Sequence, residues 1–168
     1  MPKLRPIRFA KYYLGIDPGK SGGLCRLSES GEVAALSVMP DTELDTWQWF
    51  QGWGTEFALI ELVHSMPQQG VSSTFTFGKG YGGLRMALTA VGIPFETVTP
   101  QAWQKGLGIT PKKKIESKAE FKARLRAFAQ RLFPSLDLWG RTKGEQLSVC
   151  DALLIAEFNR RVHARKES

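Results

Sequence analysis

Residues 12–23 read YYLGIDPGKSGG, and this stretch decides how the rest of the fold is built. Its apolar start predicts a buried strand ending at Asp17, and the glycines that follow predict a turn with open space beside the carboxylate. A charge in a medium of low dielectric constant is costly unless it is paired or bound to a metal. Asp17 is therefore the first candidate for a functional residue.

Short apolar runs and amphipathic segments follow in a regular order. Further strands are predicted over 24–27, 33–38, 57–63 and 95–98, and helices over 42–53, 73–91, 117–133 and within 142–165. Asp41 or Thr42 is the expected N-cap of the first helix, and Pro100 behind Thr99 predicts one more helix start. Three consecutive strands, then strands separated by helices, indicate an α/β fold with helices packed on a mixed sheet.

Length and charge are those of a small basic domain. The 168 residues fit one domain over 1–168, with a short basic N-terminal arm at 1–11. Lys and Arg outnumber Asp and Glu by 23 to 16, and eleven of these bases against four acids lie between Gln101 and Glu145. A basic excess concentrated in one segment favours a nucleic-acid partner.

Cysteines and apolar stretches limit the cellular setting. Cys25 and Cys150 lie in apolar contexts without metal-ligand spacing, which predicts small buried side chains in a reducing compartment. No apolar stretch reaches membrane-spanning length, and the basic N-terminus lacks the apolar core of a signal peptide. The expected location is the cytoplasm or nucleoid, with no membrane partner.

Three acids interrupt otherwise apolar segments: Asp17, Glu61 and Asp151. If the first and fourth strands are neighbours, Asp17 and Glu61 meet at their ends, and the last helix can bring Asp151 to the same point. Three such carboxylates suit Mg²⁺ or Mn²⁺, and two ions about 3.5–4 Å apart can hydrolyse a phosphodiester. The alternative is that each acid is separately capped or salt-bridged.

Two phosphate-binding motifs can be excluded. A Walker loop needs four residues between its first glycine and the Gly-Lys-Ser element, whereas Gly15 and Gly19 enclose three. Sugar kinases and actin-like ATPases share the acidic turn after the first strand, but they need a second phosphate loop and a much longer chain.

The acidic segments together resemble the RuvC-type Holliday junction resolvases of the RNase H-like superfamily. The similarity is carried by LGIDPG at 14–19, LIE at 59–61 and DALLIA at 151–156. The segments SMPQQGVSST at 65–74, FGKGYG at 77–82 and VTPQAWQK at 98–105 are similar to the phage branch of that family. The resemblance spans about residues 12–160.

The resemblance implies a fold, an activity and an assembly. The fold is an RNase H-like α/β domain with a five-stranded mixed sheet in the order 3-2-1-4-5, flanked by helices. The activity is that of a homodimeric, metal-dependent endonuclease placing paired symmetric nicks in four-way junction DNA, in the cytoplasm of a bacterium or a phage-infected host. Asp17 would bridge two Mg²⁺ (or Mn²⁺) ions, and Glu61 and Asp151 would complete the site.

The chain departs from the family at one position. Family members usually carry a fourth acid three or four residues before the one that matches Asp151, where this chain has Leu147 and Ser148. Glu145 could supply the missing carboxylate, Ser148 could hold a water, or the site could be inactive. The open alternatives are a different RNase H-like nuclease, for flaps, branched DNA or RNA–DNA hybrids, and a catalytically silent junction-binding protein.

Two segments are candidates for DNA contact. One is a basic segment that either faces solvent or binds the phosphates of DNA. Its lysines are Lys112, Lys113, Lys114, Lys118 and Lys122. The aromatics Phe75, Phe77 and Tyr81 either belong to the core or, as the resemblance implies, lie with Lys79 at the dimer interface and junction centre. An aromatic there could wedge between unstacked bases, and Phe75 is the preferred candidate.

Overall fold

The computed structural model describes residues 10–52, 54–62, 70–138 and 143–164, with backbone only for residues 143–148. The strands are β1 (Tyr12–Asp17), β2 (Gly23–Ser28), β3 (Val33–Val38), β4 (Thr55–Glu61) and β5 (Phe95–Val98). The helices are α1 (Glu43–Phe50), α2 (Val71–Val91), α3 (Pro100–Gly106), α4 (Lys118–Leu132) and α5 (Lys143–His163).

The five strands form one mixed sheet in the order β3-β2-β1-β4-β5, which confirms the predicted order. The pairs β1–β2 and β2–β3 are antiparallel, whereas β1–β4 and β4–β5 are parallel. The parallel strands are joined through helices, as a crossover connection requires. The two kinds of pairing meet at β1, which is therefore central to the sheet.

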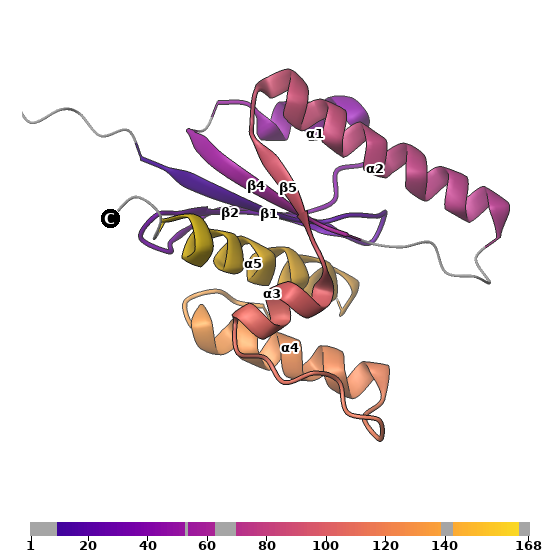
Figure 1. Cartoon of the computed structure of the whole chain (residues 1–168), viewed down its shortest axis with the longest axis vertical. Helices are drawn as coiled ribbons and strands as arrows, with labels where there is room; N and C mark the ends of the chain where they lie inside the picture. Colours follow the sequence, from indigo (N-terminus) through magenta and orange to yellow (C-terminus); the bar gives the residue numbers. More distant parts are fainter. Residues whose placement is uncertain (1–9, 53, 63–69, 139–142, 165–168) are drawn as a thin grey trace, which may run out of the picture.

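Helices cover both faces of the sheet (Figure 1). On one face α1 and α2 enclose an apolar cluster that includes Leu14, Ile16 and Leu88. On the other face α5 lies directly on the sheet, and α3 and α4 pack outside it around Trp103 and Leu125. Both cysteines are buried thiols that form no disulfide, as predicted. None of the helices among the described residues has the length and apolar character needed to cross a membrane.

Capping explains where the helices begin. Thr42 is the N-cap of α1, and its Oγ1 accepts a hydrogen bond from the Asp45 amide at 3.1 Å. Thr99 caps α3 with Pro100 in the first turn, and Ser117 forms a capping box with Glu120 at the start of α4.

Two predicted helix boundaries were wrong by a few residues. Helix α1 ends at Phe50 rather than 53, because Gly52 takes a positive φ of 77° that breaks the helix. Helix α2 begins at Val71, two residues before the predicted start, so the polar segment after Gly70 is already helical.

Candidate metal-dependent active site

The ends of β1 and β4 bring the first two acids together. In the parallel register Gly15 lies opposite Leu59 and Ile16 opposite Ile60, so Asp17 and Glu61 are the next residues on adjacent strands. Side chains alternate between the faces of a strand, which places both carboxylates on the face of Gly15 and Leu59. That face is the one covered by α5.

Gly15 lets α5 approach β1 closely enough to bring in the third acid. A Cβ at Gly15 would lie 2.2 Å from the Ala156 amide nitrogen and 2.3 Å from the Ala152 carbonyl oxygen. No side chain fits in that space, so α5 packs on bare strand backbone. Asp151 immediately precedes Ala152, and it is buried with 5% exposure at the side of the helix that faces the acids of the sheet.

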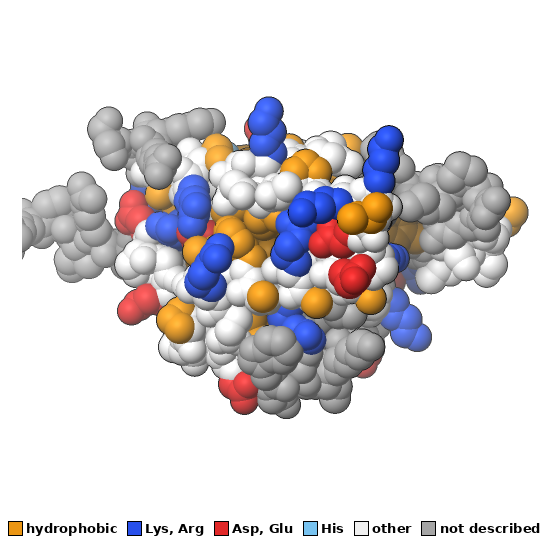
Figure 2. All heavy atoms as spheres, turned by 90° about the horizontal axis from the view of Figure 1, so that it is seen from below, with side chains coloured by type: hydrophobic (Ala, Val, Ile, Leu, Met, Phe, Trp, Pro, Cys, Tyr) orange, Lys and Arg blue, Asp and Glu red, His pale blue; other side chains and the backbone are white. Residues whose placement is uncertain are grey.

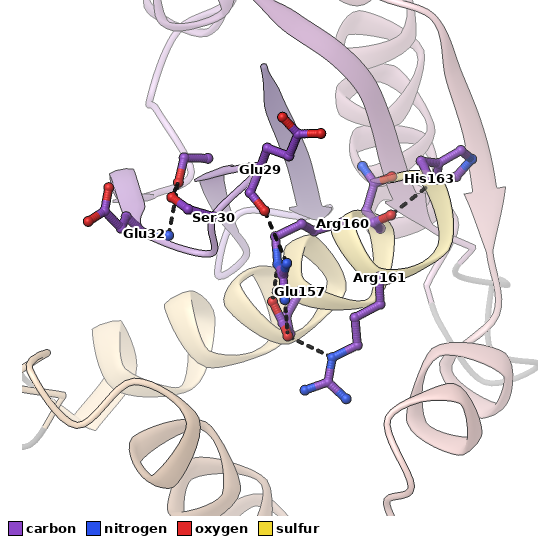
Figure 3. A network of polar contacts seen from close by, with 9 residues as sticks. Glu29, Ser30, Glu32, Glu157, Arg160, Arg161 and His163 are labelled. Atoms are coloured by element: carbon purple, nitrogen blue, oxygen red, sulfur yellow. Dashed lines mark hydrogen bonds and ion pairs between the residues drawn. The ribbon is translucent and has the colours of Figure 1, made fainter. Parts of the chain in front are cut away.

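The far half of α5 is held by polar contacts that fix its position along the sheet. Asn159 donates from Nδ2 to the carbonyls of Leu14 and Phe57, each at 2.9 Å. Figure 3 shows Glu157 accepting from Arg160 and Arg161, while Arg160 also reaches the Glu29 carbonyl in the turn between β2 and β3. The contacts of Asn159 and of Arg160 with backbone carbonyls tie the helix to the sheet, while the Glu157 pairs lie within the helix.

Burial opposes the ionisation of all three carboxyl groups, and neighbouring carboxylates add to this effect at Asp17 and Glu61. Burial raises the pKa of Asp17 well above its ordinary value, and the charges of Asp151 and Glu61 raise it further. Burial also raises the pKa of Glu61 and of Asp151. Such mutual repulsion among buried acids is the condition that a bound cation relieves.

Two partners of these acids were not assigned to the site from sequence. Trp103, on α3, donates from Nε1 to Glu61 Oε1 at 2.8 Å and so orients that carboxylate. Lys122, on α4, forms an ion pair with Asp151, and its pKa is raised because the nearby carboxylates outweigh the effect of burial. We predicted Lys122 on a phosphate-binding surface, but the acids draw its side chain inward, away from the other lysines. The proline-started helix was the sequence signal for Trp103, whereas nothing local marks Lys122.

Carboxylates are ligands that a hard divalent cation prefers, but the described acids do not form a closed set of ligands in this structure. Asp151 Oδ1 is buried without a hydrogen-bond partner, so one carboxylate oxygen is left uncompensated in a site of excess negative charge. Within the described residues no three acidic, histidine or cysteine side chains converge closely enough to hold a metal, and the Lys122 ammonium stands beside Asp151 instead. The side chains of Glu145 and Ser148, the proposed fourth position, lie outside the described part of the structure.

A cleft opens beside the turn after β1, on the α2 side of the sheet. It has a volume of about 540 Å³ and is lined by the turn after β1, the start of α1 and the first half of α2. Phe77 lines it and lies against Gly19, where an added Cβ would be 3.6 Å from the ring. Lys79 also lines it and pairs with Glu43 at 3.4 Å.

The aromatic residues of α2 differ in their surroundings. Phe75 is 74% exposed, which excludes the core alternative for this residue and leaves it available to a partner. Tyr81 is partly buried and stacks on Phe77, with ring centroids 6.1 Å apart. Tyr81 thus supports the wall of the cleft.

A lysine-rich loop precedes α4. Lys112, Lys113 and Lys114 are exposed in this loop, as is Lys118 in the first turn of the helix. Arg124 holds the loop by donating to the Thr110 carbonyl at 2.8 Å and to Glu116 at 2.9 Å. Viewed from the α4 side, the molecule shows Lys and Arg side chains spread around exposed hydrophobic groups, with a few acids among them (Figure 2).

Comparison with known proteins shows which solved structures share this fold. No family model and no curated protein matches the chain. Among solved structures, Thermus thermophilus RuvC in complex with Holliday junction substrate matches with a TM-score of 0.63 and 17% identity, covering 92% of this chain and 97% of that chain. A second Thermus thermophilus RuvC structure matches with a TM-score of 0.57 and 18% identity, covering 93% and 96%. The chain therefore has the RNase H-like fold of RuvC over nearly its whole length.

Proposed function

We propose that this chain is a divalent-metal-dependent, structure-selective DNA endonuclease that makes paired symmetric nicks in four-way junctions. The observation that carries the proposal is that Asp17, at the end of β1 in a RuvC-like sheet, lies near enough to Glu61 and Asp151 for their charges to raise its pKa. One solved protein of that fold is bound to Holliday junction substrate, which favours the same substrate class here.

The proposed active site uses carboxylate oxygens of these three acids to hold Mg²⁺ or Mn²⁺. The metal would supply positive charge for the scissile phosphate and activate a water for attack on it. Trp103 keeps the Glu61 carboxylate oriented, and the contact of α5 with Gly15 keeps Asp151 in place. The proposed phosphate contacts are Lys112, Lys113, Lys114 and Lys118, with Phe75 and Lys79 near the junction centre. Paired nicks require two active sites related by a two-fold axis, so we propose a homodimer.

The test is a labelled four-way junction incubated with the protein in Mg²⁺ or Mn²⁺, beside flap, duplex and RNA–DNA hybrid substrates. We expect symmetric nicks in the junction and little cleavage of the others. Asp17→Asn should bind the junction with unchanged affinity and leave it uncut. Cleavage by Asp17→Asn at the wild-type rate would refute the metal-site assignment, and preferred cleavage of another substrate would refute the junction assignment.

A second candidate is a junction-binding protein without nuclease activity. It is favoured by one specific observation, the ion pair of Lys122 with Asp151 in a chain that has Leu147 and Ser148 at the usual place of a fourth acid. This candidate predicts tight junction binding with no nicks in either metal, in the same experiment.

A further inference from the structure

Lys122 brings a fixed positive charge into the acid cluster. Its side chain is 29% exposed and extends from α4 to Asp151, whose side chain is 7% exposed. The ammonium also interacts electrostatically with Asp17 and Glu61, so it neutralises the cluster as a whole.

Only one oxygen of Asp151 is used by this contact. Oδ2 accepts from the ammonium, whereas Oδ1 is buried and has no hydrogen-bond partner. A buried carboxylate oxygen without a partner is costly, and a cation is the ligand that satisfies it best. Asp151 thus accepts from Lys122 with one oxygen and keeps its other oxygen, Oδ1, for a metal ion.

Charge balance decides how many further cations the cluster can hold. Among the described side chains, three carboxylates and one ammonium carry a net charge of two negative units. One divalent ion neutralises that charge, whereas two ions would leave an excess of two positive units. Four carboxylates without a lysine would balance two divalent ions. This chain has Leu147 and Ser148 where the family usually has a fourth acid, which removes one negative charge. Lys122 adds one positive charge, so both differences make the site less negative.

We propose that the Lys122 ammonium takes the place of a second metal ion, so that each chain binds a single divalent cation, held by Asp17, Glu61 and the free oxygen of Asp151. This inference rests on the proposed nuclease function for its catalytic meaning, but the count of bound ions does not depend on which substrate is cut. Lys122 contributes its charge by donating to Asp151 Oδ2, which leaves Oδ1 as the oxygen of Asp151 for the divalent ion.

The test is calorimetric titration of the DNA-free protein with MnCl₂. We expect one Mn²⁺ per wild-type chain. Lys122→Met, which keeps the apolar stem and removes the charge, should bind Mn²⁺ at least tenfold more tightly because the ammonium no longer competes for the carboxylates. Lys122→Arg should retain one ion at an affinity near that of the wild type. Arg131→Met, which removes one charge from the exposed last turn of the same helix, is the matched control and should leave Mn²⁺ affinity unchanged.

Metal dependence of cleavage gives a second measurement. Wild-type cleavage should rise with the first power of Mn²⁺ concentration, whereas Lys122→Met should lose activity at low Mn²⁺ and regain it at high Mn²⁺ with a second-power dependence. Two ions per wild-type chain, or Mn²⁺ binding by Lys122→Met no tighter than that of the wild type, would overturn the proposal.

Absence of cleavage of any substrate by the wild type would instead refute the proposed function, while the calorimetric result would still decide the role of Lys122. Thermal melting of each variant establishes that it is folded.

Discussion

At Asp17, burial and two neighbouring carboxylates all oppose ionisation in the folded chain. The pKa is raised relative to the unfolded chain, so folding is favoured at a pH below the ordinary pKa of Asp and loses stability as pH rises through the folded pKa. Asp17→Asn removes this cost. We expect the metal-free variant to be about 1 kcal/mol more stable than the wild type at pH 7. The difference should shrink toward pH 4, as measured by urea unfolding across that range.

Magnesium should reverse the order of these two proteins. In the proposed enzyme Mg²⁺ binds only the folded chain, and such a ligand stabilises the fold by an amount that grows with the logarithm of its concentration. We expect the melting temperature of the wild type to rise with added Mg²⁺ and that of Asp17→Asn to stay nearly constant. Equal shifts in both proteins would mean that Mg²⁺ binds elsewhere on the chain.

Gly15 is the residue on which the position of α5 depends. Gly15→Ala would place a methyl group within 2.3 Å of the backbone of α5, so the helix must move away from β1. We expect a loss of about 2–3 kcal/mol in the free energy of unfolding, together with loss of cleavage because Asp151 moves with the helix. Gly78→Ala is the control for stability, because an added Cβ there meets nothing within 4 Å. If both variants were equally stable, the close packing of α5 on Gly15 would be refuted.

At the scale of the elements, contacts within the chain hold the loop before α4 in place without a bound partner. Arg124 donates hydrogen bonds to the Thr110 carbonyl and to the Glu116 carboxylate. Hydrogen bonding to Arg124 helps to lower the pKa of Glu116 to about 2, so this ion pair stays charged over the physiological pH range. A loop held this way presents its lysines with little entropy left to lose on binding.

Replacing Lys112, Lys113 and Lys114 together with Gln should weaken junction binding and flatten its salt dependence. Each phosphate that the protein no longer neutralises makes the slope of log affinity against log salt shallower by about 0.9, so a decrease of about 2–3 is expected. Binding titrations across a range of salt concentrations measure it, and a melting curve checks that the variant is folded. An unchanged slope would show that the loop does not touch phosphate.

The elements also explain which parts of the site the sequence could predict. Asp17 and Glu61 could be paired in advance because neighbouring parallel strands end at one edge of a sheet, and a strand pattern is local. The contacts of Trp103 with Glu61 and of Lys122 with Asp151 span 42 and 29 residues, and they depend on how α3 and α4 pack against α5. Sequence spacing alone does not encode that packing, which is why Lys122 was predicted among the DNA-facing bases.

At the scale of the whole molecule, the two faces of the sheet have different tasks in the proposed enzyme. The α4 side carries the lysine-rich loop and Lys122, while the α2 side has the cleft beside the turn after β1 and the exposed Phe75. The three acids lie at the ends of β1 and β4 and on α5, so they belong to the α4 and α5 side of the sheet. Each chain thus offers one set of the proposed catalytic groups, and a junction with two-fold symmetry requires a second copy for the second nick.

Mixed dimers test this assembly directly. Dimers of one wild-type chain and one Asp17→Asn chain, co-expressed with different tags and purified on both, contain a single working site. On a supercoiled plasmid that extrudes a cruciform, wild-type dimers should cut both strands within one encounter and give linear DNA. Mixed dimers should stop after one nick and give open circles, because the second site lacks the carboxylate that Asp17 supplies. Linear product from mixed dimers at the wild-type rate would mean that one active site makes both cuts, and the proposed two-fold arrangement would fail.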